Sequence, residues 1–179
     1  MVWSGQTDKY QAGVAILMKK KIAQCIQDIQ YVSERVLKII LSLHDQSITI
    51  ISAYAPTNTS EIAKKNSFYD ELDKATTTIP SDHKVFVCAD FNARVGRSSK
   101  ADQEWRKILG NFGTGHTNEN GLLLLEFCSK HHLRICNSFF KHKYRGSWKH
   151  PRSNKWHQLD HILCRTKDCS NILDCYIDP

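Results

Sequence analysis

The sequence predicts one mixed α/β domain, and three observations lead to that prediction. Strand-like and helix-like segments alternate, several neighbouring strands form hairpins, and no repeat, low-complexity tract or linker interrupts the 179 residues. A chain of this length suits one ordinary domain. Its 41% hydrophobic and 24% charged residues are typical of a globular protein and not of a disordered one. We therefore treat residues 1–179 as one domain.

The first half of the chain reads as strands followed by a long helix. Residues 13–21 form a strand that breaks into charge, and residues 36–54 form an antiparallel hairpin around "HDQS" that stops before Pro56. Residues 60–77 form a helix that Thr59 or Ser60 can cap. Its apolar residues fall at helical spacing: Ile62, Phe68, Leu72 and Ala75.

The second half contains a central strand, a helix and short strands. Residues 84–92 are a nearly continuous apolar run, as expected at the centre of a covered sheet. A short helix and a glycine-rich loop occupy residues 104–121, and three short strands are predicted near 133–140, 144–150 and 158–165. Between these lies a helix over residues 120–132, with an inward face of Leu122, Leu123, Phe127 and Cys128.

Charge and cysteine usage limit the function classes. The formal charge of +7 and pI of about 9.0 favour an anionic partner. The seven cysteines include no C-x-x-C pair, so zinc-knuckle and thioredoxin motifs are excluded. We expect reduced, buried thiols in a nuclear or cytoplasmic protein. The sequence shows neither a membrane-spanning segment nor a signal peptide, so we expect a protein that is not secreted and has no membrane partner.

A possible site lies at the end of the central strand. In "VCADFNARVG", Asp90 and Asn92 are two apart, so an extended strand would point both the same way while Phe91 enters the core. A carboxylate there can hold a metal ion or accept a proton from water, and a carboxamide can contact phosphate. The alternative, a strand followed by an Asx-type turn, stays open on this stretch alone.

Other stretches add candidate residues. Tyr54 stands at a strand end before Pro56, and Asp160 lies in the apolar stretch "LDHIL", where an unpaired carboxylate is costly. Asn118 in "NENG" precedes a helix and could be a simple N-cap. Residues 131–168 hold nine Lys or Arg against two acids, interleaved with aromatics. We predict nucleic-acid contacts from Asn118, Trp148, Lys149 and Arg152, with Trp148 and Lys149 exposed.

Taken in order, "AYAPT", "ADFNARVG", "NENG", "GSWKHP" and "LDHIL" resemble the endonuclease/exonuclease/phosphatase superfamily. This superfamily includes DNase I, abasic-site endonucleases and the endonuclease domains of non-LTR retrotransposons. The "DFNARVG" form looks most like retrotransposon endonucleases and craniofacial development protein 2-like sequences. The resemblance covers about residues 13–165.

The resemblance implies a four-layered α/β sandwich, with two facing mixed β-sheets flanked by helices, and a DNA endonuclease that uses Mg²⁺ or Mn²⁺. Tyr54 matches the tyrosine that hydrogen-bonds the scissile phosphate, and Asp90 matches the aspartate that activates or positions the attacking water. Asn92 matches the asparagine that contacts phosphate and water. Asp160 matches the aspartate that orients a catalytic histidine, and Trp148 falls near an aromatic that in several relatives lies against the DNA sugar.

Two motifs of the family have no match. The strand end whose glutamate is the main metal ligand is missing before Gly13, and so is the closing "SDH" strand with its histidine; "SDH" at residues 81–83 reads as a loop. His161 cannot replace that histidine, because adjacent strand residues point to opposite faces. We therefore expect a domain incomplete at both termini, weak metal binding at Asp90 and very slow catalysis.

Three functions remain in view: a metal-dependent DNA endonuclease, a catalytically inactive nucleic-acid-binding remnant, and an enzyme acting on phosphoinositides or sphingomyelin. The basic, aromatic C-terminal third argues against the lipid substrates.

Overall fold

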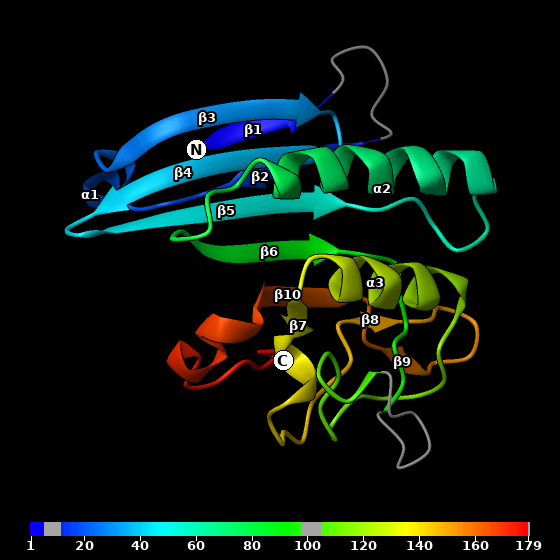
Figure 1. Ribbon diagram of the computed structural model, residues 1–179. Helices are drawn as coiled ribbons and strands as arrows, with labels where there is room; N and C mark the ends of the chain where they lie inside the picture. The colour runs from blue at the N-terminus through cyan, green and yellow to red at the C-terminus, as the bar shows by residue number, and fades with distance from the viewer. Residues whose placement is uncertain (6–11, 98–104, 179) are drawn as a thin grey trace.

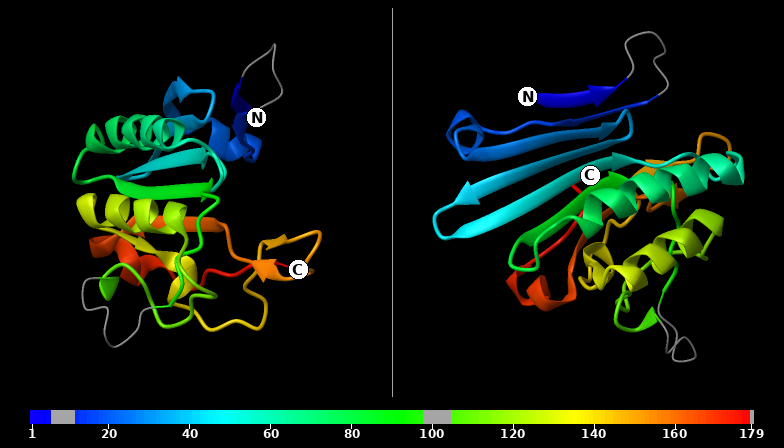
Figure 2. Two further views of the ribbon diagram at one scale, coloured as in Figure 1. Left: turned by 90° about the vertical axis from the view of Figure 1, so that its right-hand side faces the viewer. Right: turned by 45° about the horizontal axis from the view of Figure 1, so that its top comes forward.

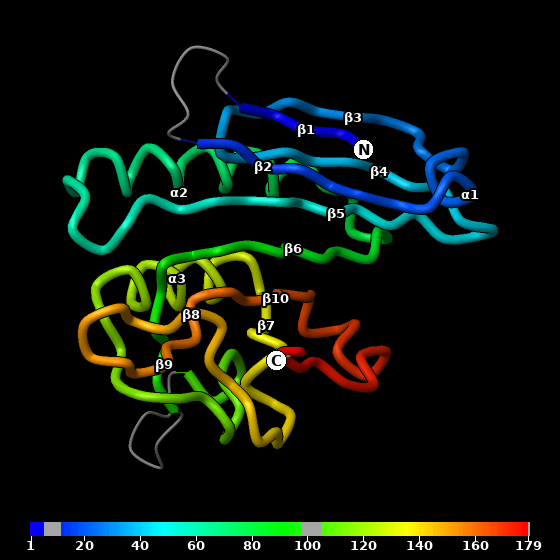
Figure 3. Tube along the Cα trace, turned by 180° about the vertical axis from the view of Figure 1, so that it is seen from behind, coloured from blue at the N-terminus to red at the C-terminus, as the bar shows by residue number. Residues whose placement is uncertain are grey.

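The computed structural model describes residues 1–5, 12–97 and 105–178. A six-stranded mixed sheet forms its centre. Helices α2 (Ile62–Thr77) and α3 (Glu119–Lys130) cover one face of this sheet (Figure 1). A two-stranded sheet of β1 (Val2–Gly5) and β2 (Gly13–Ile16) lies over β4 (Val36–Leu43) and β5 (Gln46–Tyr54) on the other face, as the view from behind shows (Figure 3). The predicted layered α/β class is confirmed, and β1 and β2 are the described strands that face the main sheet.

The central sheet brings together strands from both halves of the chain. All neighbouring strands of this sheet run antiparallel except β5 and β6 (Lys84–Asp90), which are parallel and are joined by the crossover helix α2. In spatial order the strands are β3 (Ile26–Ser33), β4 (Val36–Leu43), β5 (Gln46–Tyr54), β6 (Lys84–Asp90), β10 (Asp160–Arg165) and β7 (Leu133–Ile135).

The main core lies between this sheet and the helices. Val85 and Val87 of β6 and Leu163 of β10 are almost completely buried beneath α2 and α3. The helices contribute an apolar stripe at helical spacing, which includes Phe68, Leu72, Ala75, Leu124 and Leu125. Burying these side chains fixes the helices on one face and leaves the other face of β6 and β10 for polar residues at the strand ends.

The predicted hairpin over residues 36–54 is confirmed as β4 and β5. The predicted helix over 60–77 begins slightly later, at Ile62, and neither Thr59 nor Ser60 caps it. The N-cap is Glu61, whose side chain makes no capping hydrogen bond. Ser60 instead hydrogen-bonds Thr57 through their hydroxyls at 3.0 Å. The loop before α2 therefore satisfies its polar side chains internally.

Several element predictions need correction. The strand predicted over residues 13–21 ends at Ile16, and the short helix α1 (Lys20–Ala23) follows it. In α3, Leu122 is half exposed and Leu124 and Leu125 are buried in its place, because the helix begins at Glu119 and its inward face is set by packing. Residues 105–109 form a turn, and Glu104 lies outside the described residues.

The C-terminal third has less strand than predicted. The strand near 133–140 shortens to β7, followed by the 3-10 helix η2 (Cys136–Ser138). The strand near 144–150 is only β8 (Trp148–Lys149), which pairs with an unpredicted strand, β9 (Trp156–His157). A second 3-10 helix, η3 (Thr166–Asn171), follows β10.

Three neighbouring strands begin or end at the same end of the sheet, which we call the site edge. The parallel strands β5 and β6 end there, β10 begins there, and the β8–β9 hairpin projects beside them (Figure 2, left). No helix in the described part of the chain is both long and apolar enough to span a bilayer.

Candidate functional site

Tyr54, Asp90 and Asp160 form a row across three neighbouring strands. Asp90 is the register partner of Tyr54 on β5 and of Asp160 on β10. Residues directly opposite each other on neighbouring strands share a face of the sheet. Val87 faces the helices, so Asp90, three residues later, faces the other side together with its two partners. The structure thus brings these three residues together at the sheet edge.

Asp90 is a half-buried carboxylate beside a second carboxylate. Its Oδ1 accepts a hydrogen bond of 2.8 Å from the backbone N–H of Asn92. Burial raises the pKa of Asp90 above its ordinary value and outweighs that hydrogen bond, which lowers it; the negative charge of Asp160 raises it further. Two like charges on opposite strands repel, so a proton or a cation between them would stabilise this part of the site.

Asn92 lies in the turn that follows β6. Its φ of +47° is in the left-handed region that asparagine tolerates, and its Nδ2 donates to the carbonyl oxygen of Ala55 at 2.9 Å. Together with the hydrogen bond to Asp90, this is the Asx-type turn that the sequence left open. The extended geometry that would point Asp90 and Asn92 the same way is therefore not found, because β6 ends at Asp90 and the Asn92 carboxamide is held by Ala55. Phe91 is fully buried, as predicted.

The guanidinium of Arg35, which sequence reasoning missed, lies against Tyr54. The guanidinium of Arg35, in the turn before β4, lies 5.2 Å from the centre of the Tyr54 ring and donates to the Tyr54 carbonyl oxygen at 3.0 Å. No local signal marks Arg35, because its place depends on the pairing of β4 with β5. It adds a positive charge on the Tyr54 side of the carboxylates.

Asp160 is exposed, which corrects the expectation of a carboxylate enclosed by apolar residues. It is the first residue of β10, and the backbone N–H groups of Leu159 and Asp160 both donate to Oγ of Ser147, at 3.0 and 3.2 Å. This pair of bonds ties the base of the β8–β9 hairpin to the row of site residues.

His161 is not a partner of Asp160, as predicted. It is buried on the opposite face, where its Nε2 hydrogen-bonds the Ala93 carbonyl oxygen at 2.9 Å, and burial lowers its pKa. The "SDH" stretch at residues 81–83 is a turn at the start of β6, at the far end of that strand from Asp90, which confirms its interpretation as a loop.

Two asparagines before α3 hold the loops of the site. Asn118 Oδ1 caps α3 through the Gly121 N–H at 2.8 Å and also accepts from the Arg94 N–H at 2.9 Å. This is the capping role that the sequence analysis kept as the alternative, while its predicted contact with nucleic acid stays a prediction. Asn120, which sequence reasoning missed, is buried and donates to the carbonyl oxygens of Pro56 at 2.9 Å and Asn92 at 3.3 Å. The sequence signal for Asn120 is the second asparagine of "NENG", because a helix N-cap needs only the first.

The β8–β9 hairpin is a basic, aromatic projection next to Asp160. Trp148 and Trp156 are 42% and 62% exposed, and Lys149 and Arg152 are exposed as well, which confirms the predicted exposure of Trp148 and Lys149. Trp148 stacks on His157 with ring centres 6.0 Å apart. The hairpin therefore offers both flat apolar surface and positive charge beside the row of site residues.

The site offers few protein ligands for a metal ion. Within the described residues no group of three or more His, Cys, Asp or Glu side chains could hold one. Asp90 and Asp160 are nevertheless two carboxylates in direct register. Mg²⁺ in proteins is often held by one or two carboxylates and completed by water, so the pair fits a weakly held, largely hydrated cation.

Sequence comparisons find similarity to craniofacial development protein 2 of two organisms. No family model matches the chain. It is 30% identical to craniofacial development protein 2 of Bos taurus over 179 residues, which are 99% of the chain and 29% of that protein. It is 29% identical to craniofacial development protein 2 of Tragulus javanicus, covering 30% of its length. The chain thus spans less than a third of these curated relatives.

Three solved structures share the fold at low sequence identity. The endonuclease domain of TRAS1, a telomere-specific non-LTR retrotransposon, matches 80% of this chain and 57% of its own with a TM-score of 0.54 and 13% identity. The 3′ phosphatase NExo from Neisseria, bound to a product DNA hairpin, matches 81% and 60% with 0.57 and 12%. The AP endonuclease LMAP from Leishmania major matches 80% and 50% with 0.53 and 14%. The DNase I-like fold inferred from the motifs is confirmed.

Proposed function

We propose that this chain carries a divalent-cation-dependent phosphodiesterase site of the retrotransposon-endonuclease type, with DNA as its substrate. The observation that carries the proposal is the row of Tyr54, Asp90 and Asp160, in register on three strands. Its setting supports the assignment, because the row lies beside a basic, aromatic hairpin in a DNase I-like fold.

DNA is the substrate that the surroundings favour. The exposed side chains of Lys149 and Arg152 can neutralise backbone phosphates, and the exposed ring of Trp148 can lie against a sugar or base. The pKa of His157 is lowered first by burial and then by the positive charges of Arg94, His150 and Lys155, which indicates that this part of the hairpin is electropositive. A polyanion bound along the hairpin would bring a phosphodiester next to Asp160.

Each side chain of the row has a role in hydrolysis. Asp90 orients a water molecule and accepts its proton as the water oxygen attacks phosphorus. The bond to the leaving sugar oxygen breaks, and that oxygen takes a proton from solvent water. The Tyr54 hydroxyl donates to a non-bridging phosphate oxygen. The guanidinium of Arg35, 5.2 Å from the centre of the Tyr54 ring, adds positive charge beside it. A cation held by Asp90 and Asp160 would stabilise the charge that develops on the phosphate.

A second function remains open for a specific reason. Since no third metal-ligating side chain joins Asp90 and Asp160 among the described residues, the chain could bind DNA without turning it over. The family's closing histidine, which also has no match in this sequence, is a donor to the transition state, and loss of one such donor typically costs about 10²–10³ in rate. We therefore expect nicking that is slow even in millimolar Mg²⁺.

A plasmid-nicking assay distinguishes the two functions. The chain is compared in Mg²⁺, Mn²⁺ and chelator with Asp90→Asn, and with Asp45→Asn as a control in the exposed β4–β5 turn. We expect slow, cation-dependent nicking that Asp90→Asn removes and Asp45→Asn leaves unchanged. Nicking at equal rates by the chain and Asp90→Asn, with DNA binding retained in both, would assign the protein to the inactive, nucleic-acid-binding class.

A further inference from the structure

Two cysteine thiols are in contact where β10 passes into η3. Cys164, near the end of β10, is fully buried, and Cys169, within η3, is partly exposed. Their sulfur atoms lie 3.1 Å apart. Both are free thiols, and Cys136 and Cys175 belong to the same buried cluster. The proposed phosphodiesterase site uses none of these side chains.

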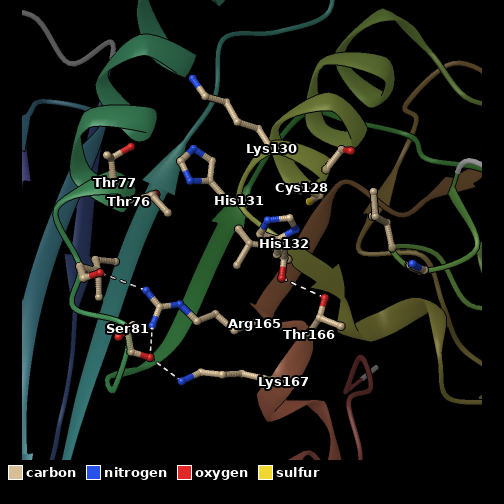
Figure 4. A pocket seen from close by; sticks show the side chains of 15 residues that line it. Thr76, Thr77, Ser81, Cys128, Lys130, His131, His132, Arg165, Thr166 and Lys167 are labelled. Carbon is tan, nitrogen blue, oxygen red and sulfur yellow. Dashed lines mark hydrogen bonds between the residues drawn. The ribbon is translucent and has the colours of Figure 1, made fainter.

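The fold holds Cys169 beside Cys164. Thr166, the first residue of η3, donates two hydrogen bonds of 2.9 Å, from its N–H and its hydroxyl, to the His132 carbonyl oxygen (Figure 4). The guanidinium of Arg165 donates to the carbonyl oxygens of four residues in the loop after α2, at 2.8–3.1 Å. The Cys169 thiol itself donates to the Arg165 carbonyl oxygen at 3.5 Å. These bonds fix the start of η3, so the contact between the two sulfurs is built into the fold.

A small cavity is lined by both cysteines. It has a volume of about 90 Å³, and Cys136, Phe139 and Phe140 also line it. A water molecule occupies about 30 Å³ in the liquid, so the cavity has room for a solute of a few atoms, such as hydrogen peroxide. A disulfide bond is about 2.0 Å long, so the two sulfurs would have to approach each other by about 1 Å to form one.

Arg134 is the cation beside Cys169, and it lines the same cavity. Burial first, and then the Cys164 thiol, raise the pKa of Cys169 to about 12, while the charge of Arg134 acts in the opposite direction. The Cys136 thiol, followed by burial, raises the pKa of Cys164 as well. Cys169 is partly exposed and has a cationic neighbour, so it is the thiol that ionises first.

The raised pKa of both thiols makes oxidation slow and favours its product. At pH 7 both groups are held mainly as neutral thiols, and the thiolate is the form that attacks an oxidant. A reduced pair that is not stabilised as thiolate also gives a disulfide that is harder to reduce.

We propose that Cys164 and Cys169 are an oxidisable dithiol, which a peroxide converts to a disulfide. The Cys169 thiolate attacks one oxygen of hydrogen peroxide, the O–O bond breaks, and the leaving hydroxide takes a proton, which gives water and a sulfenic acid. The Cys164 sulfur then attacks the Cys169 sulfur, the S–O bond breaks, and the leaving hydroxide takes the Cys164 thiol proton. The two thiols lose two electrons and two protons, and the peroxide is reduced to two molecules of water.

The cross-link would fasten η3 to β10 by closing the short loop over residues 164–169. Ile172, which follows η3, packs against the same cysteine cluster together with Phe86 and Ile162. The bond would therefore also anchor the segment after η3 on the sheet. The proposal stands without the proposed phosphodiesterase activity, because its readout is the covalent state of the cysteines.

Peptide mapping after peroxide treatment tests the proposal. The folded chain is incubated with millimolar hydrogen peroxide, the remaining thiols are alkylated under denaturing conditions, and the chain is cut with trypsin and Asp-N protease. These enzymes cut after lysine and arginine and before aspartate, so each of the seven cysteines ends in a peptide of its own. We expect the peptides of Cys164 and Cys169 to be the main linked pair, joined with the loss of two hydrogen atoms.

Two serine variants test the order of the steps. In Cys164→Ser the resolving thiol is missing, so the sulfenic acid at Cys169 should accumulate and be trapped by dimedone. Cys25→Ser removes a partly exposed cysteine outside the cluster, and it should give as much of the Cys164–Cys169 link as the unaltered chain. Circular dichroism establishes that each variant is folded, and the map of the unaltered chain tests the pairing without any substitution.

Several results would overturn the proposal. Complete alkylation of all seven cysteines after peroxide treatment would remove the redox site. A link between Cys136 and Cys164 as the main product would replace the pairing. Cys169 and Cys175 are at nearly the same sequence separation as Cys164 and Cys169, so an equal yield of that link would assign the reaction to sequence proximity and not to the fold. Absence of trapped sulfenic acid at Cys169 in folded Cys164→Ser would deny Cys169 the first step.

Discussion

Replacing Asp90 by asparagine should stabilise the folded protein at pH 7. Asp90 faces Asp160 across the sheet, and burial together with that charge raises its folded-state pKa above the ordinary value. Asparagine keeps an oxygen in place to accept from the Asn92 N–H but carries no charge. The variant therefore removes a repulsion and leaves the local hydrogen bond intact.

The magnitude follows from the register of the two strands. Like charges directly opposite each other in an antiparallel pair cost about 0.2–1 kcal/mol. For a chain of this length, 1 kcal/mol shifts Tm by about 2–4 °C, so we expect Asp90→Asn to raise Tm by about 0.4–4 °C. Asp160→Asn should give a similar gain, and the double variant should gain less than the sum, because either change removes the same repulsion.

The pH dependence gives the sign of the effect. A carboxyl whose folded-state pKa is raised holds its proton more tightly in the folded state than in the unfolded state. Stability is therefore lost as pH rises through the interval between the ordinary pKa and the raised folded-state pKa. Thermal unfolding of the chain, Asp90→Asn and Asp45→Asn at pH 3 and pH 7 measures this. A lower Tm of Asp90→Asn at pH 7, or an equal gain at both pH values, would refute the reasoning.

Three further predictions concern binding and packing. Lys149→Ala/Arg152→Ala should weaken duplex DNA binding for all sequences alike and reduce the slope of log K against log salt by about 2. Fluorescence anisotropy measures this, with Lys20→Ala/Lys21→Ala in α1 as the control variant. An unchanged slope would contradict the phosphate contacts. Asn118→Ala should lower the free energy of unfolding in urea by about 1–2 kcal/mol, because α3 loses its cap, and a neutral result would deny Asn118 that role. Phe91→Ala should cost about 3–5 kcal/mol in the same assay, since the ring is fully buried; a loss below 1 kcal/mol would contradict its place in the core.

The sequence predicts the elements of this fold best where one local pattern decides them. The β4–β5 hairpin, the central strand β6 and the burial of Phe91 follow from alternation and apolar runs. The inward face of α3 was misassigned because "NGLLLLEF" contains four consecutive leucines, and only packing against the sheet selects Leu124 and Leu125. The β8–β9 hairpin was missed in part because two-residue strands carry almost no periodic signal.

The site shows the same division. Tyr54 and Asp90 could be placed at strand ends from their neighbours in sequence, and parallel pairing of β5 with β6 then sets them side by side. Arg35, Ser147 and Asn120 could not be placed, because each acts through a partner far along the chain. Asp160 reads as enclosed in sequence, yet the sheet edge leaves it exposed, since β10 begins with this residue.

Binding of Mn²⁺, followed by its electron paramagnetic resonance signal, tests most directly whether the carboxylate pair is a cation site. The chain is titrated beside Asp90→Asn/Asp160→Asn and Asp45→Asn, with Mg²⁺ as competitor. The paired carboxylates predict one weak site that Mg²⁺ displaces, that Asp45→Asn retains, and that loses at least tenfold in affinity in Asp90→Asn/Asp160→Asn. The same Mn²⁺ isotherm for the chain and Asp90→Asn/Asp160→Asn would contradict a cation site at Asp90 and Asp160.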